Sequence, residues 1–318
     1  MRRIFISMYH YVRDLKNSKY PNIKGLDLDL FRKQIHFLRQ KFDIISMEDV
    51  IDVINKTKKL PEKALLLTFD DGYIDHYSNV FPILKENGIQ GSFFIPGKTF
   101  FENKLLDVNK IHFVLASAPI DELYNDVLLS IDSLTENTGY NGSTKEELIE
   151  KYAISNRFDS KEVVFVKRIL QTVLPEEIRN KITSELFHKY VGVSESEFAK
   201  ELYMNLDQIK EMKKEGMYIG IHGYDHYWLG NLNEEKMKND LENALNALDG
   251  VVDKDNWVIN YPYGSYNDKV VDYIKQKGCV LGLTTEVRVA DLDRDNRFLL
   301  PRLDCNDFPP KSDNYLNY

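Results

Sequence analysis

Two adjacent carboxylates follow a strongly apolar run of the chain. Residues 64–69 read ALLLTF, which predicts a buried parallel strand, and Asp70, Asp71 and Gly72 come directly after it. Two carboxylates at the end of a buried strand are unfavourable unless a positive group lies between or beside them. Taken alone, the Asp-Asp-Gly sequence could equally form a turn or begin a helix, because Asp and Gly favour both.

Two histidines follow a second predicted strand. His222 and His226 come directly after the residues MYIGI at 217–221 and are spaced four residues apart. On one helical turn, side chains at i and i+4 point the same way, so we expect these imidazoles to converge on one metal ion. A hydrogen-bonded pair of core histidines would give the same spacing.

A third motif, YPYG at residues 261–264, follows the predicted strand 257–261 and by itself predicts a turn. In parallel α/β folds, the loops at the carboxyl ends of the strands gather around one ligand site. One carboxylate and two histidines then make a set of three protein ligands that suits a catalytic metal with an open position. The second carboxylate would be free to act as a base.

The elements that must position these loops alternate along the chain. Short β-rich runs alternate with amphipathic helical patterns, which predicts a mainly parallel sheet wrapped by helices. The predicted strands cover residues 3–8, 64–69, 91–95, 217–221, 257–261 and 279–284. Residues 102–204 interrupt the alternation with helical patterns only. We expect a helical insertion that folds against the mouth of the sheet and narrows a substrate cleft, within a single domain spanning residues 1–318.

The composition argues against several classes of protein. With 42 Lys and Arg against 50 Asp and Glu, the 318-residue chain has a net charge of −8, which opposes nucleic-acid binding and docking on anionic membranes. Its N-terminal residues lack the apolar stretch of a signal peptide, and no segment reaches the length of a membrane span. Cys279 and Cys305 are expected to be reduced thiols. We therefore expect a cytoplasmic protein without stable membrane insertion; the sequence indicates no particular oligomeric state.

The three motifs together resemble those of the NodB-type polysaccharide deacetylases, carbohydrate esterase family 4. TFDDG, H-x-x-x-H and YPYG occur in the family's order, each after a predicted strand, and the resemblance covers about residues 3–100 and 205–307. It implies a distorted (β/α) barrel, here with a large helical insertion. It also implies a divalent metal, with Zn²⁺ as the expected ion, held by Asp71, His222 and His226.

The same resemblance implies the roles of two further groups. Asp70 would be the general base, and the backbone N–H of Tyr263 would be the oxyanion donor. The family's third motif often has an arginine two residues before its proline, where this chain has Asn260. We predict that Arg302, in the sequence LLPRLD, orients Asp70 instead; the alternative is a plain surface salt bridge.

A general acid must protonate the leaving amine, yet no histidine follows His226 in this chain. Family members with a permuted motif order carry the acid in a Tyr-His near the N-terminus, and His10 here follows a tyrosine. We therefore predict His10 as the acid, with His112, or Asp70 acting twice, as alternatives. Because the first and last strands adjoin in a closed barrel, Asp304 could lie beside His10 and keep it protonated.

These residues predict a metal-dependent hydrolase that removes an N-acetyl group from an amino sugar. The absence of a recognisable export signal favours a sugar nucleotide, a lipid-linked saccharide or another glycan precursor in surface-polysaccharide biosynthesis. One alternative is a hydrolase of another non-peptide C–N amide bond. Another is a catalytically inactive glycan-binding protein, which the second carboxylate at Asp70 opposes, because a metal-binding scaffold needs only one of the two.

Overall fold

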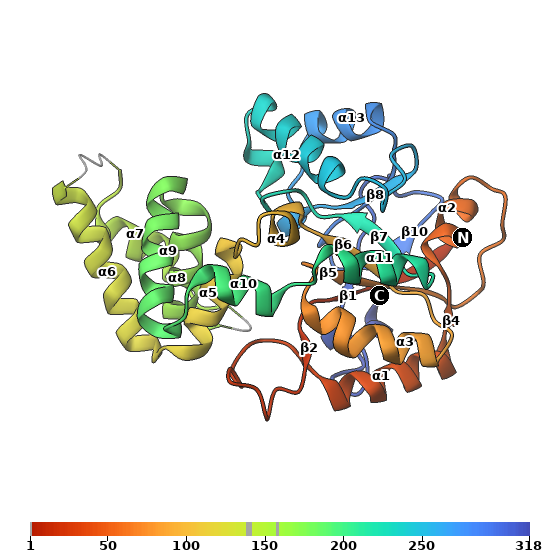
Figure 1. The fold of residues 1–318 in the computed structure, drawn as a ribbon, viewed down its shortest axis with the longest axis horizontal. Helices are drawn as coiled ribbons and strands as arrows, with labels where there is room; N and C mark the ends of the chain where they lie inside the picture. The colour runs from red at the N-terminus through yellow and green to blue at the C-terminus, as the bar shows by residue number, and fades with distance from the viewer. Residues whose placement is uncertain (1, 138–141, 157–158) are drawn as a thin grey trace. The chain divides into compact units, whose positions relative to one another are not determined.

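The described chain forms two compact units. The computed structural model describes residues 2–137, 142–156 and 159–318 (Figure 1). The barrel unit comprises Met1–Lys16, Gly25–Lys104 and Ala199–Tyr318, and the helical unit comprises Asn17–Lys24 and Leu105–Phe198.

The barrel unit is built on a nine-stranded sheet in the described part of the chain. Its order is β10-β1-β5-β6-β7-β8-β9, with β4 beside β5 and β11 beside β1, and the pairing of β10 with β1 is antiparallel whereas the other pairings are parallel. The strands are β1 (Arg3–Tyr9), β4 (Asp43–Ile44), β5 (Ala64–Asp70), β6 (Ser92–Ile95), β7 (Tyr218–Ile221), β8 (Trp257–Asn260), β9 (Cys279–Leu283), β10 (Ala290–Asp291) and β11 (Leu303–Asp304). A separate two-stranded parallel ladder joins β2 (Val12–Arg13) to β3 (Leu26–Asp27).

Strand β5 is buried along its whole length, as its apolar sequence predicts. Successive side chains of a strand point to opposite faces of the sheet, and β5 divides accordingly between two hydrophobic clusters. Leu65 and Leu67 belong to the cluster that includes the covering helices, whereas Leu66 belongs to the cluster formed with alternate residues of β1, β8 and β9. The sheet therefore has a packed interior and a packed outer layer.

The segment after β9 brings the end of the chain beside its beginning. Leu300 forms a parallel bridge with Leu283 of β9, and β11 pairs in parallel with β1, with Leu303 opposite Ser7. Residues 300–304 thus lie between β9 and β1 and curl the sheet into a distorted (β/α) barrel. This confirms the predicted fold class and the prediction that the segment around Arg302 lies beside the first strand.

Helices cover the outside of the barrel unit, and Figure 1 shows α12 and α13 on one side of the strands and α1 and α3 on the other. Among them, α11 begins with a capping box, in which the side chains of Asn205 and Gln208 accept each other's backbone N–H. None of the described helices is long and apolar enough to cross a membrane. The helices are α1 (Leu28–Lys41), α2 (Met47–Ile54), the π-helical turn η1 (His76–Val80), α3 (Phe81–Glu86), α4 (Gly97–Phe101), α11 (Leu206–Lys214), α12 (Glu234–Ala247) and α13 (Asp268–Gln276).

The helical unit accounts for the interruption predicted at residues 102–204. Its elements are α5 (Asp107–Ser117), α6 (Ile120–Asn137), α7 (Lys145–Tyr152), α8 (Lys161–Arg168), η2 (Ile169–Val173), α9 (Glu176–Val191) and the beginning of α10 (Glu195–Leu202). Phe113, Phe187 and Phe198 pack edge to face in its core. The predicted helical content is therefore confirmed. The placement of this segment over a substrate cleft, within a single domain, stays a prediction.

Candidate metal and catalytic site

The polar residues singled out in the sequence lie at the carboxyl ends of the parallel strands. Asp70 is the last residue of β5, His222 follows β7, and Tyr263 lies in the turn after β8. His10 follows β1, which pairs with β5. The parallel sheet thus brings residues from distant parts of the sequence to one edge, as predicted.

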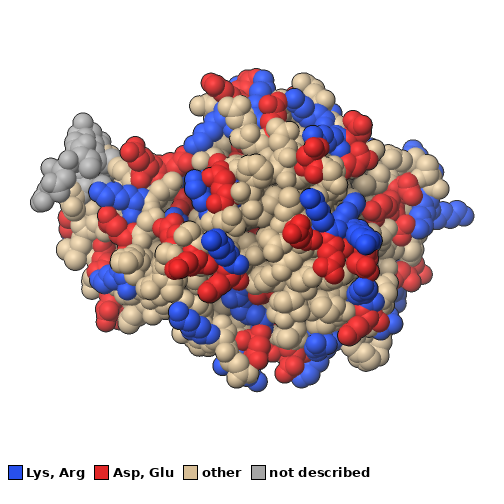
Figure 2. Space-filling view, in the orientation of Figure 1, with Lys and Arg blue, Asp and Glu red and all other residues tan. Residues whose placement is uncertain are grey.

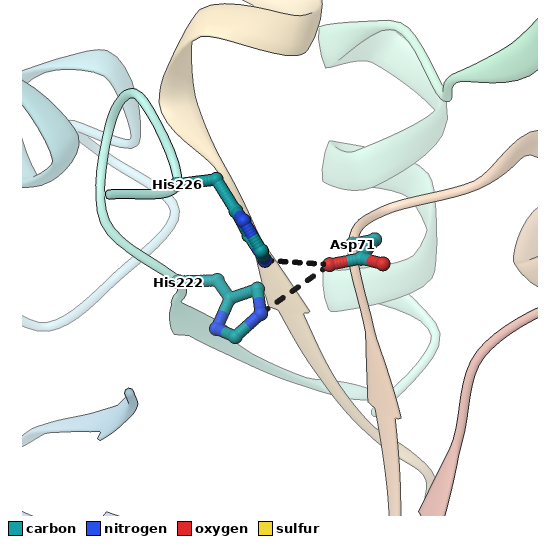
Figure 3. Close-up of side chains that lie close together, drawn as sticks. All are labelled: Asp71, His222 and His226. Carbon is teal, nitrogen blue, oxygen red and sulfur yellow. Dashed lines mark ion pairs between the residues drawn. The ribbon is translucent and has the colours of Figure 1, made fainter. Parts of the chain in front are cut away.

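Asp71, His222 and His226 form a compact group of metal-ligating side chains. Figure 3 shows both imidazoles directed at the Asp71 carboxylate, with the two Nε2 atoms 3.3 Å and 3.2 Å from its Oδ1. One ligand atom from each residue lies within 4.8 Å of the other two, and all three residues are buried. The predicted ligand set therefore converges in space.

The two histidines do not converge by the predicted helical turn. Residues 222–226 form an irregular loop, in which Gly223 (φ 68°) and His226 (φ 57°) have left-handed backbone conformations. These two left-handed conformations, and not the i, i+4 geometry of a helix, direct both imidazoles to the same side. The prediction of convergence was correct, but the helical reason for it was wrong.

Backbone strain is concentrated at this site. Five non-glycine residues of the described chain have positive φ, and three of them are Asp71 (φ 76°), His226 (φ 57°) and Tyr263 (φ 58°). Left-handed conformations of this kind cost about 1–3 kcal/mol each and persist only where the surroundings impose them. Each of the three chemical motifs therefore contains one residue whose conformation is set by the site.

The protonation state of the imidazoles fits a divalent cation. Nδ1 of His222 donates to the carbonyl of Asn260 at 2.6 Å, which leaves Nε2 unprotonated in the neutral ring. Burial lowers the pKa of His226, although the Asp71 carboxylate opposes this, so the neutral form of that ring is favoured. With the proton on Nδ1 of each ring, two nitrogen lone pairs would face one carboxylate oxygen. A divalent metal of the Zn²⁺ type would satisfy all three donors.

A tyrosine absent from the sequence-based predictions holds the other oxygen of the metal-ligating carboxylate. Tyr73 Oη donates to Asp71 Oδ2 at 2.6 Å, and the Tyr73 ring is buried and stacked on Tyr11 with ring centroids 4.0 Å apart. This bond leaves Oδ1 as the oxygen that faces the histidines. The only sequence signal for it was the position of a tyrosine two residues after Asp71.

Arg302 binds the other carboxylate in the way the sequence predicts. Its Nη1 and Nη2 donate to the two Asp70 oxygens at 2.9 Å each, and Nη2 also donates to Asn260 Oδ1 at 2.9 Å. The Arg302 side chain is 1% exposed, which excludes a surface salt bridge. Burial alone would raise the pKa of Asp70, but Arg302, with a smaller contribution from His10, holds it below its ordinary value.

His10 lies beside Asp70 at the open side of the site. Its Nε2 is 3.8 Å from Asp70 Oδ2, and its side chain is 39% exposed against 2% for Asp70. The buried His76, whose pKa burial lowers to about 4, donates from Nε2 to the His10 carbonyl at 2.9 Å. The carboxylate beside His10 is thus Asp70 and not Asp304, which caps the turn at residues 305–307 instead.

The alternative acid His112 lies in α5 of the helical unit.

In the barrel unit, Tyr263 lies against His226 and Trp228. Its ring packs edge to face on His226 with centroids 4.6 Å apart and stacks on Trp228 with centroids 4.3 Å apart. The role of the Tyr263 backbone N–H as an oxyanion donor stays a prediction. Its left-handed conformation is what sets the direction of that group.

Comparisons with known proteins agree with this geometry. A family model described as polysaccharide deacetylase matches residues 57–119 and 158–282. The chain is 19% identical to YxkH of Bacillus subtilis, a protein named as a polysaccharide deacetylase, over 289 residues that make up 91% of this chain and 67% of that protein. It is also 44% identical over 83 residues to the poly-β-1,6-N-acetyl-D-glucosamine N-deacetylase of Escherichia coli, which is 26% of this chain but 12% of that protein.

Solved structures show the same fold. The Streptococcus pyogenes deacetylase PplD in complex with acetate has a TM-score of 0.56 and 18% identity, with 99% of this chain and 96% of that chain covered. IcaB from Ammonifex degensii has a TM-score of 0.55 and 18% identity, with the same coverage. These likenesses extend over the helical unit as well as the barrel unit.

Proposed function

The chain belongs to the polysaccharide deacetylase family, and on that basis we propose that it is a metal-dependent hydrolase that removes an N-acetyl group from an amino sugar. The observation that carries this proposal is the division of labour between two adjacent aspartates. Asp71 faces two histidine nitrogens, whereas Asp70 is held by Arg302 and lies beside His10. A site that only bound a metal or a glycan would need the first arrangement and not the second.

Asp71, His222 and His226 would hold the metal, with Zn²⁺ as the proposed ion. When bound, a divalent ion at this position polarises the acetamide carbonyl and lowers the pKa of a water molecule beside it. The strained turn at Tyr263 would direct a backbone N–H toward the oxygen on which negative charge develops.

Asp70 would take the proton from the attacking water. Because Arg302 keeps its carboxylate ionised and fixed in direction by two hydrogen bonds, Asp70 can accept a proton without first changing its position. His10 would then give a proton from Nε2 to the nitrogen of the departing amine. Its exposed side chain can exchange protons with solvent between turnovers.

The proposed substrate is an N-acetylglucosamine unit in a glycan or a glycan precursor. The name of the Escherichia coli relative states poly-β-1,6-N-acetyl-D-glucosamine as its substrate, which supports this sugar. Figure 2 shows Lys and Arg interspersed with Asp and Glu over the described part of the face it draws, which suits a neutral saccharide better than a polyanion. A cytoplasmic location and a role in surface-polysaccharide biosynthesis remain parts of the proposal.

Acetate release tests the proposed function. The protein, loaded with Zn²⁺, is incubated with acetylated sugar nucleotides, N-acetylglucosamine oligosaccharides and simple non-sugar acetamides, and free acetate is measured. We expect release from an N-acetylated saccharide that stops when the metal is chelated and returns when Zn²⁺ is restored. Release from the non-sugar amides alone would favour the other C–N hydrolase, and no release from any of them by the loaded protein would contradict the proposal.

A further inference from the structure

We propose that Asp240 is the positioning residue that fixes the metal-ligating loop, residues 222–226, in the conformation that presents both histidines to one ion. This inference rests on the proposed metal site. Asp240 lies on α12, is 4% exposed, and accepts the backbone N–H of Tyr224 at 3.0 Å and of Asp225 at 2.8 Å. One buried carboxylate thus binds two consecutive N–H groups in the middle of the loop.

The loop needs an external anchor because its own backbone does not provide one. Its left-handed residues at Gly223 and His226 prevent the regular hydrogen bonds of a helix. Its carbonyls are bound by a second element: the backbone N–H groups of Gly97 and Lys98, at the start of α4, donate to the carbonyls of Gly223 and Tyr224 at 3.1 Å and 3.0 Å. The loop is therefore held between α4, which binds its carbonyls, and Asp240, which binds its amides.

The packing is close enough for Asp240 to restrict the loop sterically as well. A Cβ atom placed on Gly223 would lie 2.9 Å from Asp240 Oδ2. The carboxylate thus occupies the space beside Gly223 and leaves no room there for a side chain. The Lys98 ammonium also pairs with the Asp225 carboxylate, which joins the side chain of Asp225 to α4.

Burial raises the pKa of Asp240 to about 6, so at neutral pH its carboxylate is ionised and is a charged acceptor. Hydrogen bonds from backbone amides to an ionised carboxylate are about twice as strong as those to a neutral acceptor. An asparagine has nearly the same shape but only one acceptor oxygen, so its NH₂ group would face one of the two amides and leave it unpaired. Residues that orient metal ligands from outside the ligand set typically change metal affinity about 10–100-fold when they are replaced.

The test compares Asp240→Asn with Glu242→Gln, a control on the same helix whose carboxylate binds Tyr273 and Lys277 and not the loop. Hydrogen exchange of the Tyr224 and Asp225 amides is measured in the metal-free protein, and the dissociation constant of Co²⁺ is measured by its absorption spectrum. We expect faster exchange at both amides in Asp240→Asn and a Co²⁺ dissociation constant about 10–100-fold weaker. Glu242→Gln should match the unmodified protein, and Asp240→Glu, which keeps two acceptor oxygens, should recover most of the affinity.

Exchange rates and Co²⁺ affinity that are unchanged in folded Asp240→Asn would overturn the inference, as would faster exchange with unchanged affinity. If Asp240→Asn does not fold, Asp240→Ser undergoes the same two measurements, with changes expected in the same direction. A failure of the unmodified protein to bind Co²⁺ would instead overturn the metal site of the proposed function. In that case the exchange measurement would still show whether Asp240 holds the loop.

Discussion

Two regions of the site are built on the adjacent residues Asp70 and Asp71, but the groups that surround the two carboxylates differ. The base region, Asp70 with Arg302 and His10, surrounds its carboxylate with a bidentate guanidinium and leaves His10 open to solvent. The metal region, Asp71 with His222 and His226, surrounds its carboxylate with two imidazole nitrogens and a tyrosine hydroxyl, all buried.

The backbone creates this difference. Asp70 still belongs to β5, whereas Asp71 is left-handed, with φ of 76°, and begins the turn. The change of conformation between the two residues directs their side chains into separate surroundings. The proposed roles of base and metal ligand for two identical, adjacent carboxylates would then follow from their different partners and not from their own chemistry.

The largest effect is expected from damage to the metal region. Asp71→Asn removes the anionic ligand, so we expect the purified protein to lose most of its bound metal and its deacetylase activity together. Metal content by atomic spectroscopy and acetate release measure both. An Asp71→Asn protein that retains a full equivalent of metal would show that the ion is held elsewhere.

Removal of His10, the proposed acid, should slow turnover without affecting the metal. For His10→Ala we expect kcat to fall about 10²–10⁴-fold, the usual contribution of a general acid, with unchanged metal content. His36→Ala, which removes an exposed imidazole on α1 bonded to Gln40, is the matched control and should be silent. Full activity in His10→Ala would leave the role of acid to His112 or to Asp70 acting twice.

Arg302 controls both the stability and the ionisation of the base region. Replacement by Gln leaves Asp70 buried and unpaired, which is expected to lower the free energy of unfolding by about 3–5 kcal/mol. Arg302 holds the pKa of Asp70 down against burial, so its loss raises that pKa and moves the acidic limb of the kcat/KM profile to higher pH.

Urea unfolding and pH–rate profiles check these two effects of the Arg302 change. Arg302→Lys, which keeps the positive charge but not the two parallel hydrogen bonds of the guanidinium, should give smaller changes in the same direction. Arg288→Gln, whose partners Glu286 and Asp295 lie outside the site, is the control. An acidic limb that stays in place in both Arg302 variants would contradict the link between Arg302 and Asp70.

The smallest effect is expected from loss of the hydrogen bond between Tyr73 and Asp71. Tyr73→Phe removes the hydrogen bond to Asp71 Oδ2 and keeps the stacked ring, so we expect metal affinity to weaken about tenfold, at the lower end of such effects. Competition with a chelator measures it. Tyr77→Phe, whose hydroxyl binds Glu211 away from the site, should leave the affinity unchanged. Equal affinities of Tyr73→Phe and the unmodified protein would show that Asp71 needs no second partner.

The sequence predicted the parts of the site that depend on strand order. Apolar runs locate β5, β7 and β8 to within one residue at each end, and the chemical residues follow from the rule that loops gather at the carboxyl ends of parallel strands. Arg302 was also predicted, because the missing arginine at position 260 required a substitute. The two-residue strands β10 and β11 were missed, since such short runs carry no periodic pattern.

What the sequence could not predict depends on individual backbone conformations and on contacts between distant residues. The residue type alone does not determine the left-handed φ of His226, so the helical explanation of the histidine spacing was wrong. The hydrogen bond from His222 to the Asn260 carbonyl joins residues 38 positions apart. The N–H groups that donate to the Asp240 carboxylate belong to residues 15 and 16 positions before it. The predicted partner of His10, Asp304, was wrong for a local reason: its carboxylate accepts the N–H of Asn306 in its own turn, and Asp70 lies beside His10 instead.

Asp70→Asn is the most direct test of whether the two aspartates have different roles. Metal content and acetate release of Asp70→Asn are measured beside those of Asp71→Asn and the unmodified protein, under one set of conditions. We expect Asp70→Asn to keep its metal at the level of the unmodified protein while turnover falls below detection. Loss of metal from Asp70→Asn to the same extent as from Asp71→Asn would contradict this expectation, because Asp70 would then be a ligand and the base would lie elsewhere.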